Sequence, residues 1–404
     1  MKQAKTQLTT AVLISLMSTA GVALPYPVLA PYFMNNMSPA FTQYLGLPSE
    51  LLFGIVVALY PLGLLLGSSV IGAASDLYGR KTTLLVTLWG SLAGYGLSVL
   101  ALVMDAYVLF AVARLLTGIF EGNGSIARAI AADLDPVIPR EKSLPWVYGA
   151  AYGGWMVGPM LGGLMMTLWV GAAFVAAGGI LLLAILLVWV SVPSQKVEAP
   201  KTPLVSLLHK HNSFSLVAIG EIRPIFYFYL LYCLGITLFY EFNPIWLVEV
   251  FDATPMDIAW LSVVFTLGMI FVSAVGHKRI TDQFGTLPTI GLFIILTGVL
   301  IMAMTFNSLT GVYVLFLFTG MTAASVGNLF GIWFSDRFQH HGNGKVFGLT
   351  TAIFCLANVV VGIAGGLVAV VSTEFAMVLA GLLMIVSLIW LTRLTSFANE
   401  ATSQ

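Results

Sequence analysis

Four ionisable side chains stand inside long apolar segments of this 404-residue sequence: Arg114, Glu121, Arg128 and Glu241. A charge at the centre of a membrane helix costs at least about 2.5–3.5 kcal/mol, so each should face a partner or a water-filled cavity. The first three recur every seven residues, which places them on one face of a helix expected over 107–131. Buried carboxylates can take up and release protons, and guanidinium groups can bind carboxylates or phosphates.

Each of these charges also has a structural explanation. Arg128 lies near one end of its segment and can extend to the lipid headgroups. Arg114 can belong to a structural pair, and Glu121 can pair with either arginine and hold helices together. Glu241 lies in the segment GITLFYEFNPIW, where Pro244 favours a break in the backbone, and it can be a satisfied polar residue near the outer rim.

The overall composition indicates that these charged side chains belong to a membrane protein. The chain is 59% hydrophobic and 8% charged, whereas soluble domains carry about 25% charged residues. This balance excludes an ordinary cytosolic enzyme, a nucleic-acid binder and a disordered protein, and apolar runs of about 20 residues argue against a β-barrel. We expect an all-α membrane protein with no enzymatic activity, cofactor, metal site or nucleic-acid partner. Twelve spans are predicted, at 8–33, 51–74, 82–104, 107–131, 146–168, 172–192, 224–247, 258–277, 288–306, 311–334, 346–371 and 375–393.

The basic residues predict the orientation. With the N-terminus inside, sixteen of the seventeen Lys and Arg residues fall in internal loops and flanks, and the external loops hold only acids. The positive-inside rule therefore predicts a multi-pass protein of the cell membrane, a bacterial inner membrane or a plasma membrane, with both termini in the cytoplasm.

The chain is predicted to form two six-helix bundles, 1–195 and 214–404, joined by a cytoplasmic linker at 196–213. The loop DLYGRK at Asp76 has a degenerate counterpart, DQFGTL at Asp282, so an Asp-x-x-Gly pair recurs at an offset of 206 residues. Repeated bundles of this kind are typical of transporters whose site lies between the halves. The sequence contains no phosphate-binding P-loop, which favours secondary transport over ATP-driven transport.

The segment GAASDLYGRK, between the second and third spans, resembles the corresponding loop of the major facilitator superfamily. The resemblance implies a fold of twelve helices in two pseudo-symmetric bundles, with this loop as a conformational latch. An acid at the end of the fourth span usually engages the loop arginine, so an ion pair between Asp133 and Arg80 is expected. The predicted latch residues are Gly72, Asp76, Gly79, Arg80, Lys81 and Asp133.

The fifth span, GAAYGGWMVGPMLGG, is similar to the glycine- and proline-rich motif of drug:proton antiporters, including the tetracycline-efflux type. Small residues at this spacing let another helix pack closely, and proline permits a kink. Packing alone, with no role in the direction of transport, is the alternative explanation of the pattern. The predicted helix-packing residues are Gly149, Gly153, Gly158, Pro159, Gly162 and Gly163.

In the superfamily the first, fourth, seventh and tenth spans line a central cavity. The resemblance implies that Glu241 and the Arg114 face look at each other across it. Glu241 is the first candidate for proton coupling and Glu121 the second, because all five histidines are expected in cytoplasmic loops. The predicted substrate-binding residues are Arg114, Glu121, Glu241, Asn243, Tyr26, Tyr152, Trp155, Tyr232, Asn328 and Trp333.

The predicted function is proton-coupled secondary transport by a monomer that exports a small organic molecule by antiport. The first span contains no Asp or Glu, unlike that of many drug exporters, and two arginines are expected to face the cavity. Proton-coupled uptake of an anionic metabolite or a siderophore-like carboxylate is therefore an open alternative. A receptor or scaffold with a transporter fold is another.

Overall fold

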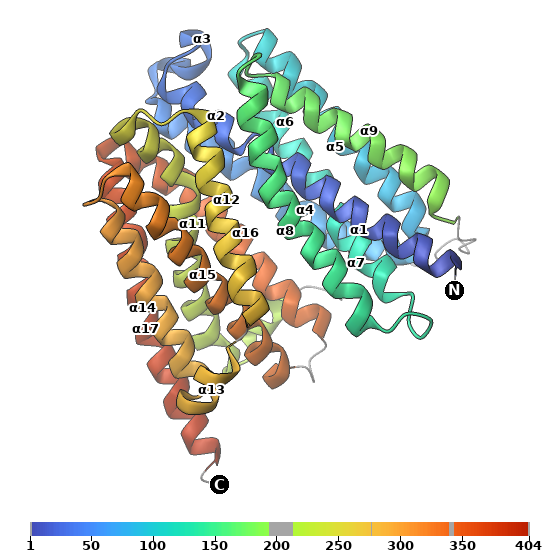
Figure 1. Ribbon diagram of the computed structural model, residues 1–404, viewed down its shortest axis with the longest axis vertical. Helices are drawn as coiled ribbons and strands as arrows, with labels where there is room; N and C mark the ends of the chain where they lie inside the picture. Colours follow the sequence, from blue (N-terminus) through green and yellow to red (C-terminus); the bar gives the residue numbers. More distant parts are fainter. Residues whose placement is uncertain (1, 194–212, 276, 339–342, 403–404) are drawn as a thin grey trace. The chain divides into compact units, whose positions relative to one another are not determined.

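The structure is a computed structural model of the chain and describes residues 2–193, 213–275, 277–338 and 343–402. Every element in this part of the chain is helical (Figure 1). The predicted linker at 196–213 lies outside the described residues, apart from its last residue. The chain divides into two compact units, Met1–His211 with Ala253–Val263, and Asn212–Asp252 with Val264–Gln404.

Two helices of the first unit, α1 and α6, each pack against several others. Helix α6 packs against α4 and α5, and α1 packs against α7, α8 and α9. The elements, blue to green in Figure 1, are α1 (Lys2–Ala23), α2 (Tyr26–Met34), α3 (Pro39–Thr42), η1 (Tyr44–Gly46), α4 (Ser49–Tyr78), α5 (Arg80–Val103), α6 (Tyr107–Phe120), α7 (Asn123–Ala132), α8 (Arg140–Met166) and α9 (Ala172–Ser191).

The second unit packs α11 against α16 and α17, and α14 against α15 and α17. Helix α12 contributes its first residues to the first unit and its remaining residues to the second. The elements are η2 (Ser213–Ala218), α11 (Ile222–Phe251), α12 (Pro255–Val275), α13 (Lys278–Phe284), α14 (Thr286–Met304), α15 (Leu309–Phe338), α16 (Asn343–Val371) and α17 (Thr373–Thr402).

Ten helices within the described residues are long and apolar enough to cross a membrane. Two of the twelve predicted spans are not among them. The prediction of a single helix over 107–131 is wrong. The backbone leaves helical geometry at residues 121–122, which divides the segment into α6 and α7. Helix α8 has 27 residues, but its glycines and aromatic side chains make it less apolar than the other spans.

Glycines allow the helices of each unit to approach closely. A Cβ atom on Gly63 of α4 would lie 2.7 Å from the backbone nitrogen of Ile119 in α6. In the second unit, a Cβ atom on Gly235 of α11 would lie 2.7 Å from the Ala380 carbonyl oxygen in α17. Contacts this short leave no room for a side chain, so the helices pack backbone to backbone.

Two glycines form matching turns. Gly79, between α4 and α5, has φ 89° and ψ 148°, and Gly285, between α13 and α14, has φ 82° and ψ 163°. Residues with a Cβ atom rarely adopt this conformation. The two Asp-x-x-Gly pairs of the sequence therefore end in the same unusual backbone geometry, each directly before a long helix.

Candidate functional site

A break between two helices places Glu121 at a non-helical position. Helix α6 ends at Phe120 and α7 begins at Asn123. Glu121 has φ −81° and ψ 69°, and its backbone N–H donates to the Gly118 carbonyl at 3.0 Å, which tightens the last turn of α6. The three charges of this span therefore do not share one face of a continuous helix.

The Glu121 carboxylate is partly buried and is held by side chains from other segments. Ser18 of α1 donates to its Oε1 atom at 2.5 Å, and the Asn123 amide donates to the same oxygen at 3.4 Å. Thr87 of α5 donates to the Asn123 side-chain oxygen at 2.7 Å, so the amide nitrogen is directed toward the carboxylate. Residues of α1, α5 and α7 thus converge on one carboxylate.

Arg114 of α6 is the second charged group of this region and is only 7% exposed. Its guanidinium lies over the ring of Tyr60 in α4, 4.8 Å from the ring centroid, and it interacts electrostatically with Glu121. Its Nε and Nη1 atoms have no hydrogen-bond partner within the described part of the chain. A buried donor left unpaired costs about 1–3 kcal/mol, and more when it is charged. The guanidinium is therefore suited to bind an anionic or carbonyl oxygen of a ligand.

A polar face of α5 completes this region, and the sequence analysis missed it. Thr87, Ser91 and Tyr95 recur every four residues and are all buried. The Tyr95 hydroxyl donates to the Gly21 carbonyl of α1 at 2.9 Å, and the buried Ser91 lies between Thr87 and Tyr95 on the same face of α5. The signal was present, because polar residues at this spacing in an apolar span share one helix face.

Ser18 had no such signal in the sequence. A single serine is common in membrane helices, where it bonds to a neighbouring helix or to its own backbone. Its contact with Glu121 joins residues 103 positions apart and is visible only in the fold.

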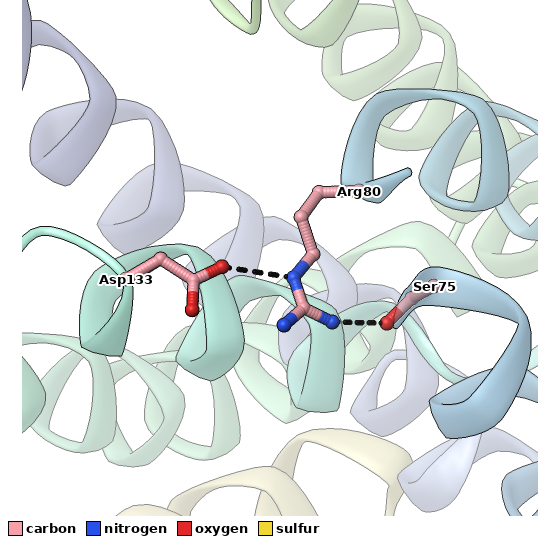
Figure 2. Close-up of polar contacts among 3 residues, drawn as sticks. All are labelled: Ser75, Arg80 and Asp133. Carbon is pink, nitrogen blue, oxygen red and sulfur yellow. Dashed lines mark hydrogen bonds and ion pairs between the residues drawn. The ribbon is translucent and has the colours of Figure 1, made fainter. Parts of the chain in front are cut away.

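Arg80, at the start of α5, connects the ends of α4 and α7 (Figure 2). Its Nε atom donates to Asp133 at 3.0 Å, and its Nη1 atom donates to Ser75. The two members of the ion pair are 17% and 49% exposed. Exposed pairs contribute only about 0–1 kcal/mol, so this contact can form and open at little cost in stability.

The other predicted latch residues lie around this pair. Gly79 forms the turn before Arg80, and Gly72 and Asp76 lie on α4, but their surroundings are outside the described part of the structure. Lys81 donates to the Trp189 carbonyl of α9 at 2.7 Å. The described contacts of Lys81 and Arg80 thus involve different helices.

The glycines of α8 differ in their surroundings. A Cβ atom on Gly158 would lie 2.7 Å from the Ala20 carbonyl oxygen of α1, and one on Gly162 would collide with the Leu24 carbonyl. Gly153 has only a flexible leucine side chain near it, and Gly149 has open space. Pro159 and Gly163 lie on the same helix. Gly154, whose Cβ atom would lie 2.8 Å from the Leu16 carbonyl oxygen, belongs with Gly158 and Gly162, so these three glycines pack against the last turns of α1 and the residue that follows it.

Aromatic side chains predicted to bind substrate lie on α2 and α8. The ring of Tyr26 meets Trp155 edge to face, with centroids 6.5 Å apart. Trp155 is 44% exposed and Tyr152 is partly exposed. Arg128, on α7, lies over the Tyr148 ring at 5.7 Å from its centroid. This face of the first unit carries accessible aromatic surface.

In the second unit, α11 runs through Pro244 without interruption, so the expected break there is wrong. The reason lies in Asn243, whose amide nitrogen donates to the Tyr240 carbonyl at 3.0 Å and to the Phe239 carbonyl at 2.9 Å. Proline has no N–H for the carbonyl four residues earlier, and the asparagine supplies the missing donor. Glu241, two residues before Asn243, is partly buried.

The remaining predicted binding residues of this unit make separate contacts. The hydroxyl of buried Tyr232 lies 3.5 Å from the Ala323 carbonyl of α15. The Asn328 amide donates to Ser273 of α12 at 3.0 Å, and Trp333 packs beside Phe330 at 6.1 Å between centroids. The structure therefore places Asn328 and Trp333 on α15 and Tyr232 on α11.

His277, expected in a loop, is the N-cap residue of α13 and makes a contact that the sequence analysis missed. Its Nε2 atom lies 2.8 Å from the Ser325 hydroxyl of α15, and its ring meets Phe293 edge to face at 5.6 Å. The imidazole therefore links this loop to α14 and α15.

The sequence matches the Major Facilitator Superfamily over residues 11–240 and 225–404. The chain belongs to the major facilitator superfamily. A tetracycline resistance protein of class E from Escherichia coli is 35% identical over 131 residues, which are 32% of this chain and 31% of that protein. Major facilitator superfamily domain-containing protein 10 of Homo sapiens is 31% identical over 147 residues, 34% of this chain and 31% of that protein. The matches thus span about a third of each relative.

Solved structures share the fold of this major facilitator over nearly its whole length. The crystal structure of a D-xylose-proton symporter has a TM-score of 0.74 at 17% identity and covers 96% of each chain. The human organic anion transporter MFSD10 (TETRAN) has a TM-score of 0.68 at 19% identity, covering 96% of this chain and 99% of that chain. The chain is therefore a multi-pass membrane protein of a transporter superfamily.

Proposed function

We propose that this major facilitator exports a small organic molecule in exchange for protons, and that Glu121 carries the proton. The observation that supports this assignment is the hydrogen bond from Ser18 to Glu121 beside the helix break. A hydroxyl group donates to an ionised carboxylate and accepts from a protonated one, so the pair can persist in both states. A partly buried carboxylate with such a partner is suited to bind and release protons.

The proposed topology has twelve spans. Ten of them are the helices that are long and apolar enough by themselves. Helices α6 and α7 together form another span, and α8 forms the last. The distribution of Lys and Arg supports both termini in the cytoplasm. The ion pair of Arg80 and Asp133 would then lie on the cytoplasmic side. We assign it the role of a latch that closes one state of the transport cycle.

Export is favoured over uptake by the relatives. Several of them are named for tetracycline resistance, and the glycine motif of α8 resembles that of such antiporters. The exposed ring of Trp155 and the half-buried rings of Tyr26 and Tyr152 supply a surface on which a planar organic molecule can stack. Sequence alone ranks Glu241 first for proton coupling. The hydrogen-bonded setting of Glu121 reverses that order, and Glu241 is the second candidate.

A second candidate function is transport of an organic anion. It is favoured by Arg114, which is buried and has two guanidinium N–H positions without a partner among the described residues. The human MFSD10 structure, which has the same fold, is described as an organic anion transporter. Under this function the planar guanidinium binds a carboxylate or phosphate of the substrate through paired hydrogen bonds.

Gradient-driven accumulation in proteoliposomes tests the proposal, with tetracycline and a panel of organic anions as substrates. Glu121→Gln is expected to abolish accumulation driven by a pH gradient but to retain substrate exchange, which needs no net proton movement. Glu374→Gln, at an exposed carboxylate in the first turn of α17, is the matched control and should be unaffected. Full accumulation in both Glu121→Gln and Glu241→Gln would refute proton coupling through these groups.

A further inference from the structure

A groove of about 720 Å³ opens on the surface of the first unit, where α5, α6 and α9 meet. Its volume lies in the range of about 300–1,000 Å³ that is typical of small-molecule sites. The walls are largely apolar and include Val86, Trp89, Phe120 and Trp189. Lys81 is the one ionisable residue among the described residues that line it.

The groove lies on helices long and apolar enough to span a membrane. Val86 and Trp89 of α5 are 56% and 55% exposed, and Trp189 of α9 is 67% exposed. Large apolar side chains that are exposed on a membrane-spanning helix are solvated by lipid. Tryptophan is enriched at the boundary between the acyl chains and the headgroups. These features place the groove in contact with lipid, close to the level of the headgroups.

Lys81 stands at the end of this groove. Its ammonium donates to the Trp189 carbonyl at 2.7 Å and so connects α5 with α9. An ammonium has three donors, so this bond leaves donors for an acceptor in the groove. The neighbouring guanidinium of Arg80 is engaged by Asp133 and Ser75. No acid lines the groove among the described residues, so its electrostatic character is positive.

We propose that this groove is a binding site for an anionic phospholipid. Lys81 and the exposed hydroxyl of Thr82 bind the phosphate, and an acyl chain lies against Val86, Trp89 and Trp189. The charge of Lys81 favours an anionic headgroup over a zwitterionic one, and the apolar walls favour a lipid over a free phosphate. A bound lipid would hold the start of α5, one residue from the arginine that pairs with Asp133.

Native mass spectrometry of the delipidated full-length protein in detergent tests this site. The probes are phosphatidylglycerol, phosphatidylcholine with the same acyl chains, and glycerol 3-phosphate as the headgroup alone. Phosphatidylglycerol is expected to bind roughly fivefold more tightly than phosphatidylcholine, the effect of about one lysine near an anionic headgroup. Glycerol 3-phosphate should not bind detectably.

Matched variants separate the headgroup from the acyl chain. Lys81→Gln should remove the preference for phosphatidylglycerol, Lys81→Arg should retain it, and Lys142→Gln, at an exposed lysine outside the groove, should leave it unchanged. Val86→Trp fills the groove and should weaken binding of both lipids. Val103→Trp places the same side chain at another exposed position of the same helix and should not.

Three results would overturn the site. A preference for phosphatidylglycerol that survives Lys81→Gln would place the anionic headgroup elsewhere. Equal binding of both lipids by the unmodified protein, or unchanged binding in Val86→Trp, would show that the groove does not select an anionic phospholipid. Because lipid binding is measured without transport, these outcomes are independent of the proposed export function.

Discussion

Ser18 of α1 donates a 2.5 Å hydrogen bond to Glu121 at the point where the backbone leaves helical geometry between α6 and α7. The bond joins α1 to the break itself. A change in the charge of the carboxylate therefore acts directly on a contact between two helical segments. Local changes of charge at such contacts are a common way to bias one conformation over another.

Removing the hydroxyl group of Ser18 should impair coupling. Ser18→Ala leaves the carboxylate without its shortest hydrogen bond, and a bond to a charged group contributes about 1.5–3 kcal/mol. We expect gradient-driven transport to fall roughly tenfold or more, measured as initial rate in proteoliposomes. Ser15→Ala is the control, because Ser15 is also buried on α1 but donates to the Val147 carbonyl. Equal loss of coupling in both variants would argue against a special role for Ser18.

The charge of Arg114 alone should not be sufficient for binding an anion. Arg114→Lys keeps the charge but loses the planar set of donors and part of the contact with Tyr60. The apparent KM for an anionic substrate should rise about tenfold or more, while the KM for a neutral substrate should hardly change. Arg128→Lys, which alters an arginine over Tyr148, should leave both values close to those of the unmodified protein. An unchanged KM for every anion tested would remove Arg114 from the binding site.

Much of the architecture follows from the sequence because its causes are local. Apolar runs of about 20 residues predict spans, and ten of them coincide with helices of the described residues that are long and apolar enough to cross a membrane. The loop motif predicts a partner for Arg80, and Asp133 lies 3.0 Å from it. The Asp-x-x-Gly pair recurs in the sequence, and both of its glycines, Gly79 and Gly285, have positive φ values.

The site could be predicted only in part, because its geometry depends on contacts between distant segments. Spacing arithmetic assumes an uninterrupted helix, and it failed where Glu121 leaves helical geometry. The missing N–H of Pro244 also predicted a break, whereas the donor supplied by Asn243 keeps α11 continuous. Ser18 could not be recognised at all, because its importance comes from a partner 103 residues away.

The ion pair at the start of α5 should respond to reversal of its charges. Arg80→Asp and Asp133→Arg alone should each reduce transport, and the double variant should recover part of it, because attraction between the two positions is restored. Thermal stability should change little, because an exposed pair contributes about 0–1 kcal/mol. Transport rates and unfolding temperatures measured on the same preparations check both parts. Single variants with normal transport would exclude the latch.

Asn243 should matter for stability mainly because Pro244 is present. Asn243→Ala leaves the Tyr240 carbonyl without its amide donor in a buried segment, at a cost of about 1–3 kcal/mol. Pro244→Ala restores a backbone N–H to the same carbonyl. The cost of Asn243→Ala should therefore be smaller in the Pro244→Ala background, as measured by thermal unfolding in a double-mutant cycle. Additive effects would show that the asparagine has another role, such as binding substrate.

Two glycines of one motif on α8 should respond in opposite directions to the same substitution. Gly158→Ala places a methyl group 2.7 Å from the Ala20 carbonyl oxygen and from the Ala23 side chain, so α1 and α8 must separate. Overpacking of this kind costs about 1–3 kcal/mol. Gly149→Ala meets no atom within 4 Å, and alanine favours a helix by up to about 1 kcal/mol over glycine, so it should stabilise the protein slightly. Thermal unfolding in detergent measures both changes, and loss of stability in Gly149→Ala would contradict the packing described for this helix.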